Sequence, residues 1–144
     1  MKTLIMKFLK KRIFYGVSAL FLLFFLSSCG KKIIFPISTV IPSASASVTI
    51  KTDKNKNYNL NVVVKHMAGP ERLTPPRQNY VVWIGTTEKG NMNMGRLSIS
   101  KGLTGSVKVV TPFKPNVVFI SAEDDSGVTT PGDQVVLKTN SFDL

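Results

Sequence analysis

Cysteine and histidine are almost absent from this chain of 144 residues, which has one of each, Cys29 and His66. A single cysteine cannot form a disulfide within the chain, so the hydrophobic core must be sufficient to stabilise the fold. A histidine-based triad would depend on His66 alone, and nothing near it in the sequence indicates acyl transfer. The only acidic cluster is Glu123 to Asp125, and adjacent residues of a strand point to opposite faces. We therefore expect a protein that is not an enzyme, with no cofactor and no evident small-molecule substrate.

Long apolar runs are also scarce, and the only one, Ile13 to Leu26, is shorter than the roughly 20 residues of a membrane-spanning helix. It follows five basic residues and leads into Leu26-Ser27-Ser28-Cys29. This order of basic, apolar and small residues is typical of an export signal. The last four residues resemble the lipobox of bacterial lipoproteins, in which the cysteine thiol receives a diacylglyceryl group and becomes the first mature residue.

That resemblance implies a signal peptide over residues 1–28 and a lipid anchor on Cys29 that binds the membrane. It places the domain outside the cytoplasm, in the periplasm or at the cell surface, and favours the outer membrane over the inner. A chance cysteine beside an ordinary cleavage site is the alternative. Several acyl chains hold a protein on a membrane far longer than one chain can.

Acidic residues are few, with eight against 19 basic ones. Without residues 1–28, which carry five of the basic residues, 14 basic and eight acidic residues remain, a net charge of +6. The basic residues are scattered and are not interleaved with aromatic ones, so nucleic acid is not an expected partner. Lys31 and Lys32 are placed beside the predicted anchor, where anionic headgroups would attract them.

Residues 29–47 are rich in serine, alanine and proline, a composition that predicts the lipidated cysteine followed by a flexible tether. Within it, Ile33-Ile34-Phe35 either dips into the membrane interface or pairs as an edge strand. Residues 48–144 then form the predicted folded domain.

From Val48 onward the apolar residues alternate with a period of two, and no stretch of ten residues has a helical stripe. The runs Tyr80 to Ile84 and Val117 to Ala122 are apolar on both faces, which is typical of central strands covered on both sides. Turn residues separate the runs. The pattern predicts an all-β domain, an immunoglobulin-like antiparallel β-sandwich of about seven strands, with a small barrel as the alternative. The predicted strands cover residues 48–51, 58–65, 80–84, 95–100, 107–111, 117–122 and 134–139.

Trp83 is the only tryptophan and lies on the third predicted strand. Immunoglobulin-type domains bury a tryptophan at this place against the opposite sheet. We therefore expect Trp83 to be buried between the sheets, with Phe113 and Phe119 as neighbours.

Two segments carry a resemblance to a known family: YVVWIGTTEKGNMNMGRL at residues 80–97 and VVFISAEDDSGVTTPGDQVVL at residues 117–137. They resemble the extracytoplasmic C-terminal domain of anti-sigma-K factors, although Asp124 stands where that family usually has proline. The family also has a cytoplasmic sigma-binding segment and a transmembrane helix, where this chain has a predicted lipid anchor. The resemblance therefore implies a sensor-type β-domain and not regulation of a sigma factor.

The two longest predicted connections, residues 66–79 and 124–133, should lie at the same end of such a sandwich. Long loops on a rigid scaffold are where binding residues concentrate. We take Arg72, Arg77, Asp124 and Asp125 as candidate residues for binding another envelope protein. The alternative is that an arginine of the first connection merely forms a surface ion pair with an acid of the second.

A periplasmic copper chaperone is the alternative function. His66, Met67, Met92 and Met94 loosely resemble the histidine and methionine ligand sets of such proteins, and soft thioethers suit Cu(I). Those proteins use two histidines, whereas this chain has one, and methionine commonly fills cores. The sequence therefore predicts no metal site.

Overall fold

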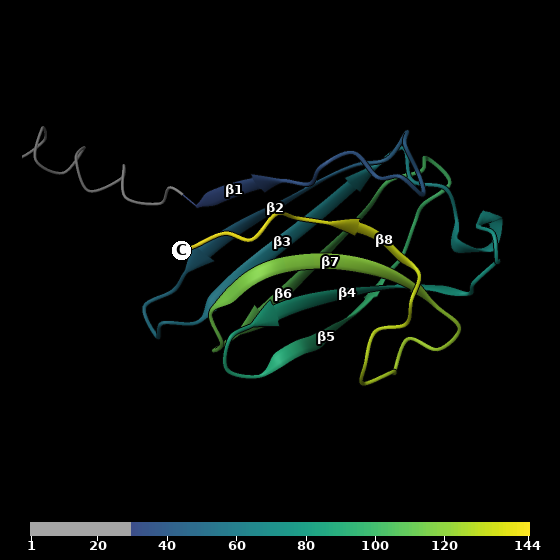
Figure 1. Cartoon of the computed structure of the whole chain (residues 1–144). Helices are drawn as coiled ribbons and strands as arrows, with labels where there is room; N and C mark the ends of the chain where they lie inside the picture. Colours follow the sequence, from purple (N-terminus) through teal and green to yellow (C-terminus); the bar gives the residue numbers. More distant parts are fainter. Residues whose placement is uncertain (1–29) are drawn as a thin grey trace, which may run out of the picture.

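The computed structural model of the protein describes residues 30–144, so the predicted signal peptide and Cys29 lie outside the described residues. The described chain is built from strands, with one short 3-10 turn, η2 (Pro70–Arg72), after the third strand (Figure 1). None of its segments is a helix long and apolar enough to cross a membrane. The strands are β1 (Lys31–Ile34), β2 (Ser45–Thr52), β3 (Tyr58–Lys65), β4 (Asn79–Thr86), β5 (Gly90–Leu97), β6 (Gly105–Thr111), β7 (Pro115–Glu123) and β8 (Val135–Lys138).

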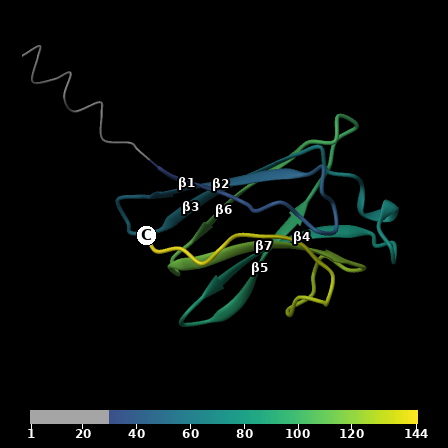
Figure 2. The ribbon, with the colours of Figure 1, turned by 45° about the horizontal axis from the view of Figure 1, so that its top comes forward.

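Two antiparallel sheets of four strands face each other (Figures 1 and 2). Sheet A has the order β1-β2-β3-β6, and sheet B has the order β5-β4-β7-β8. The predicted β-sandwich is confirmed, with one strand more than expected in the described chain, and the barrel alternative is wrong because the sheets are separate. The pairing of β3 with β6, and of β4, β7 and β8 in the other sheet, is the arrangement expected of immunoglobulin-like connectivity.

The prediction of a flexible tether over residues 29–47 is wrong for its described part. Residues Lys31–Ile34 form the edge strand β1, so of the two alternatives for this segment the structure shows the edge strand. Phe35, Ile41 and Ala44 are buried in the core. Buried Ser38 donates to the carbonyl of Val136 in β8, which fastens the segment to sheet B.

The physical reason for this error is the small size of alanine. The serine and alanine repeat over residues 43–47 is the beginning of the period-two pattern of β2, in which Ala46, Val48 and Ile50 all point inward. Alanine buries little apolar area, so the repeat resembles a low-complexity linker more than a strand.

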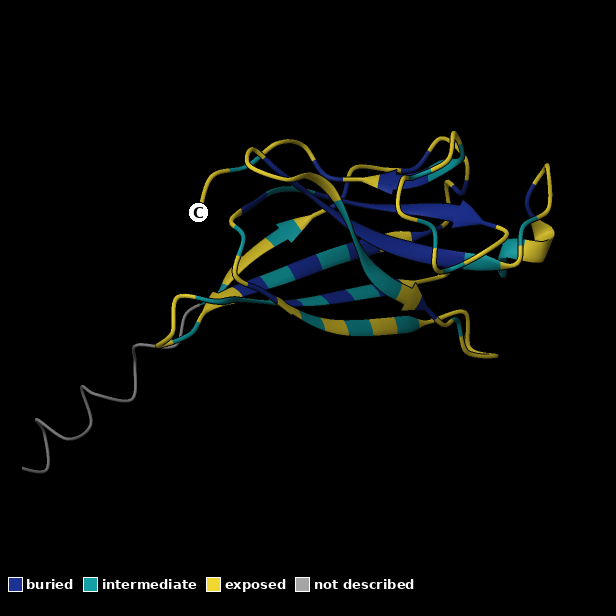
Figure 3. Ribbon diagram, turned by 90° about the horizontal axis from the view of Figure 1, so that it is seen from below, coloured by how far each residue is buried: buried dark blue, intermediate teal, exposed yellow. Residues whose placement is uncertain are grey.

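The main core lies between the sheets, where every second side chain of β2 and β3 is buried (Figure 3). The other face of sheet A is polar and solvated, which explains the alternation. In sheet B the central strands β4 and β7 are buried along almost their whole length. The prediction that these two strands are covered on both sides is therefore confirmed.

Trp83 is fully buried, but the prediction that it lies between the sheets is wrong. Together with Val81 and Phe119 it forms a second cluster, which lies apart from the main core. Since Val82 and Ile84 belong to the main core, the alternation along β4 turns Trp83 to the outer face of sheet B. The ring of Phe119 stacks on that of Trp83 at 6.0 Å between centroids. Phe113 lies instead beneath the ammonium group of Lys89 and is not part of this cluster.

Strand β5 spans residues 90–97, earlier than the predicted 95–100, and its register against β4 shifts between Val82 and Trp83. Gly95 has a φ of 108° at this irregularity. A side chain other than glycine rarely adopts that conformation, so Gly95 permits the bulge. The bulge places Asn93 on the same outer face as Trp83, where it becomes part of the site described next.

Candidate functional site

The two longest connections of the sandwich meet at one end, as the sequence predicts. The β3–β4 connection covers residues 66–78 and the β7–β8 loop covers residues 124–134. Arg77 joins them: its Nη1 atom lies 2.7 Å from an Asp124 oxygen, and its Nε atom donates to Gln134 at 2.9 Å. Gln134 in turn donates to the carbonyl of Pro75 at 3.2 Å. This end of the molecule is therefore braced by side chains.

A chain of hydrogen bonds holds the β7–β8 loop over the outer face of sheet B. The indole Nε1 of Trp83 donates to Ser121 at 2.8 Å, and Ser121 donates to Glu123 at 2.5 Å. Glu123 also accepts from the amide of Gly132 at 2.8 Å. The amide nitrogen of Asn93 donates to the carbonyls of Ser126 and Val128, at 3.0 and 2.7 Å. The loop thus has a fixed shape and acts as the lid of the Trp83 cluster.

The four candidate partner residues divide into two groups. Arg77 and Asp124 are brought together in an ion pair, as the alternative reading predicted, and Arg77 also lies 3.7 Å from Asp133. Asp125 is exposed and accepts from the amide of Gly127, an ordinary turn contact. Arg72 is not part of this cluster, because its side chain is exposed and lies 4.0 Å from that of Glu71. Arg77 is consequently a structural brace, and Arg72 is available at the surface.

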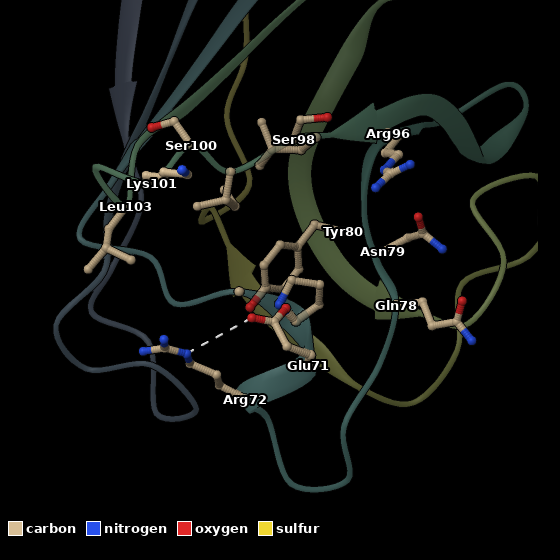
Figure 4. Close-up of a pocket in the computed structure, with 14 residues that line it drawn as sticks. Glu71, Arg72, Gln78, Asn79, Tyr80, Arg96, Ser98, Ser100, Lys101 and Leu103 are labelled. Carbon is tan, nitrogen blue, oxygen red and sulfur yellow. Dashed lines mark ion pairs between the residues drawn. The ribbon is translucent and has the colours of Figure 1, made fainter.

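A cleft of about 450 Å³ lies at the same end, beside the brace (Figure 4). Its walls come from the β3–β4 connection, from the start of β4, from the end of β5 and from the β5–β6 connection, over residues 69–72, 78–80, 96–101 and 103. Tyr80 lies between the two sides, with Gln78, Asn79 and Arg96 on one and Ser100, Lys101 and Leu103 on the other. Most of these side chains are polar, so the cleft suits a polar ligand segment.

The charge of the cleft is positive, with Arg72, Arg96 and Lys101 against the single carboxylate of Glu71. Within the described chain, Arg96 and Lys101 have neither an ion pair nor a hydrogen bond from their side chains. Burial raises the pKa of the Tyr80 hydroxyl well above its usual value, and the nearby charge of Glu71 adds to the shift. Tyr80 therefore stays neutral and donates to the carbonyl of Ala68 at 2.8 Å, which fixes the floor of the cleft.

The residues of the copper alternative do not present a ligand set at the surface. Met67 is fully buried in the main core, whereas the neighbouring His66 is exposed. Met92 and Met94 are half-buried on β5 and pack against the main core. Among the described residues, no group of three or more histidine, cysteine, aspartate or glutamate side chains is placed to hold a metal ion. These contacts are those of methionines that fill a core.

The double substitution Met92→Leu with Met94→Leu tests this packing role. Because leucine conserves the volume of methionine, we expect the free energy of unfolding to change by less than about 1.5 kcal/mol. Thermal unfolding followed by circular dichroism measures the change, and Cu(I) competition against a chelator should show no tight site in either protein. Nanomolar Cu(I) binding that the double substitution abolishes would instead support the copper function.

The chain matches no protein-family model, no curated protein and no solved structure. The site therefore has to be interpreted from its own geometry.

Sequence reasoning missed Arg96, Lys101 and Tyr80 as site residues. Arg96 lies at the end of β5 and Lys101 in the turn that follows, so both lie outside the two long connections on which the sequence prediction was based. Tyr80 reads as one apolar residue of a buried strand. The one signal in the sequence was that two basic residues, Arg96 and Lys101, flank the serine-rich segment 98–100. This segment lies beside the β3–β4 connection only because of how the two sheets pack, which the sequence does not show.

Proposed function

We propose that this protein is a membrane-anchored lipoprotein of the bacterial envelope whose β-sandwich binds another envelope protein without catalysing a reaction. The observation that supports this most directly is the braced end of the sandwich. Arg77 fixes two long loops to one another, and a polar cleft opens beside them. A preformed surface of this kind binds without first losing the conformational entropy of mobile loops.

The position of the chain start supports the same proposal. Strand β1 begins at Lys31, which pairs with Ile50 near the β2–β3 turn, at the end of the sandwich remote from η2 (Figure 1). An anchor on Cys29 would therefore hold one end of the sandwich and leave the braced end free for a partner.

The charge of the cleft indicates the chemistry of that partner. Three cationic side chains against one carboxylate favour an acidic segment. Among the three, the cationic groups of Arg96 and Lys101 are best placed to interact with carboxylates of a partner, since neither is engaged by another side chain of the described chain. The resemblance to anti-sigma-K factors is consistent with such a sensing or assembly role.

The substitution Arg96→Ala with Lys101→Ala tests the cleft in the producing bacterium. Both side chains are exposed, so we expect the free energy of unfolding to stay within about 1 kcal/mol of the wild type. A photo-crosslinking residue at Ser100, on the cleft wall, should capture a partner several-fold less often in the variant. Western blotting and mass spectrometry of the adduct measure the loss and identify the partner.

The matched control removes the same charge elsewhere. Lys54 and Lys89 lie in turns at the opposite end of the sandwich, and Lys54→Ala with Lys89→Ala should leave the adduct unchanged. If the cleft variant and the control yield equal amounts of adduct with the fold intact, the cleft is not the docking surface.

A further inference from the structure

Among the residues that the structure describes, the outer face of sheet A carries four lysines and no carboxylate. Strand register assigns its positions, because directly paired residues of antiparallel strands share a face. One row across the sheet is Lys32, Thr49, Asn61 and Lys108, and the next is Ile34, Ser47, Val63 and Ser106. Lys51 and Lys65 belong to the same face, where they pair with Asn59 and Ser45. The remaining side chains are hydroxyls, amides and a few aliphatic groups.

The carboxylates of the described chain lie elsewhere. Glu123, Asp124, Asp125 and Asp133 belong to the braced end of sheet B, and Glu71 belongs to η2. Glu88 lies in the β4–β5 turn, and Asp143, whose backbone carbonyl accepts from Lys31 of β1, forms an ion pair with Lys114. Asp53 lies in the β2–β3 turn of sheet A. Asp53 accepts hydrogen bonds from the backbone amides of Asn55 and Asn57, at 2.8 and 2.9 Å. These bonds lower the pKa of Asp53, and the bond from Asn57 has the largest effect. The molecule is therefore polarised, with a basic face on sheet A.

One exposed isoleucine belongs to this basic face, and a second follows it closely in the chain. Ile34 is 73% exposed and belongs to the face itself, and Ile37, just beyond the end of β1, is 82% exposed. They are the two most exposed large apolar side chains of the described chain. Exposed apolar side chains beside lysines are typical of surfaces that bind at the membrane interface, where the apolar groups insert and the cations meet headgroups.

The start of the described chain adds a third observation. Gly30 is the only residue between Cys29 and β1, and β1 is the edge strand of sheet A. Because the segment up to Ser47 is folded into the sandwich, no long flexible linker separates a lipid on Cys29 from the first strand of the sheet. Headgroup attraction acts over about one Debye length, roughly 8 Å at physiological salt, so the start of β1 would lie within its range.

We propose that the outer face of sheet A lies on an anionic lipid bilayer. The proposal rests on the lipid anchor of the proposed function, which brings this sheet to the membrane, and on the charge of the face, which acts independently of the anchor. In this orientation sheet B faces away from the lipid.

Lysine footprinting tests the orientation. The full chain, as processed by the producing bacterium, is mixed with vesicles of phosphatidylcholine alone or with part of that lipid replaced by phosphatidylglycerol. A membrane-impermeant amine reagent then labels exposed lysines, and mass spectrometry reads each site. We expect Lys65 and Lys108 to be labelled several-fold less on the anionic vesicles than on the neutral ones, and high salt to abolish the difference. Lys138 in β8 and Lys89 in the β4–β5 turn both belong to sheet B and should react equally on both.

Flotation of the same vesicles separates this inference from the proposed anchor. Flotation with both vesicle types and protection only on the anionic ones supports both. Flotation with both and no protection overturns the orientation and leaves the anchor. Flotation with the anionic vesicles alone, with protection, supports the basic face and contradicts the anchor, and flotation with neither contradicts both.

A charge reversal on the face gives a second measurement. Lys32→Glu should reduce the protection of Lys65 and Lys108 on anionic vesicles, whereas Lys138→Glu on the other sheet should not. Protection of these lysines in the producing cells but on neither vesicle type would place a different acidic partner on this face and overturn the membrane assignment.

Discussion

Trp83→Ala should lower the melting temperature of the protein by roughly 15 to 30 °C or prevent folding. The side chain is fully buried, stacks on Phe119 and donates to Ser121, and truncation of a core tryptophan typically costs about 3 to 5 kcal/mol. A domain of this size has only about 5 to 15 kcal/mol of stability, and each kcal/mol shifts its melting temperature by about 4 to 8 °C. Thermal unfolding of the full chain, followed by circular dichroism, measures the shift.

The position of Trp83 beneath the β7–β8 loop predicts a local effect as well. Loss of the indole removes the support of the loop, so the amide of Gly132, which donates to Glu123, should exchange its hydrogen faster in the variant. Phe113→Ala is the matched control, because Phe113 is only half-buried and should cost much less. A shift of one or two degrees for Trp83→Ala, equal to that of Phe113→Ala, would contradict the burial of Trp83.

The face occupied by Trp83 shows where sequence reasoning reaches its limit. The alternation in β3 distinguishes a wet face from a dry one, and the strand was predicted with its observed bounds. Strand β4 is apolar on both faces, so its pattern predicts a central strand but does not say which residues point between the sheets. The expectation that Trp83 lies between the sheets therefore came from the immunoglobulin comparison alone, and it was wrong, whereas its burial was predicted correctly.

The cover over Trp83 could not be predicted for a related reason. It depends on contacts between residues far apart in the chain, such as Asn93 with Val128, across a bulge that shifts the register of β5. No local sequence pattern predicts a contact of this kind. The shared end of the two long connections was predictable, because it follows from strand order rather than from individual side chains.

The site divides in the same way. The sequence singled out Arg77 and Asp124, and the structure joins them, but as a brace of the loops rather than as free binding groups. Arg96 and Lys101 contribute to the cleft only because the β5–β6 connection packs beside the β3–β4 connection. Charge in a loop is visible in a sequence, whereas its engagement by a neighbour depends on the tertiary fold.

Cys29→Ala should abolish lipid attachment and leave a precursor that retains residues 1–28. The thiol is the group that would receive the diacylglyceryl moiety, and alanine has no nucleophile to replace it. Buried acyl chains contribute about 0.8 kcal/mol per methylene, so the wild type should remain with the membrane fraction and pass into detergent. Metabolic labelling with a fatty-acid probe, together with the intact mass of the protein, measures both the attachment and the processing.

Ser28→Ala is the matched control, since it keeps a small residue before the cysteine and leaves the thiol in place. We expect this variant to be labelled and processed like the wild type. Both substitutions precede Gly30, the first described residue, so neither should change the melting temperature of the sandwich. Wild-type protein that takes up no fatty acid and is released from cells at the same mass as Cys29→Ala would end the lipoprotein proposal. The basic face of sheet A would then be the remaining reason to expect the protein at a membrane.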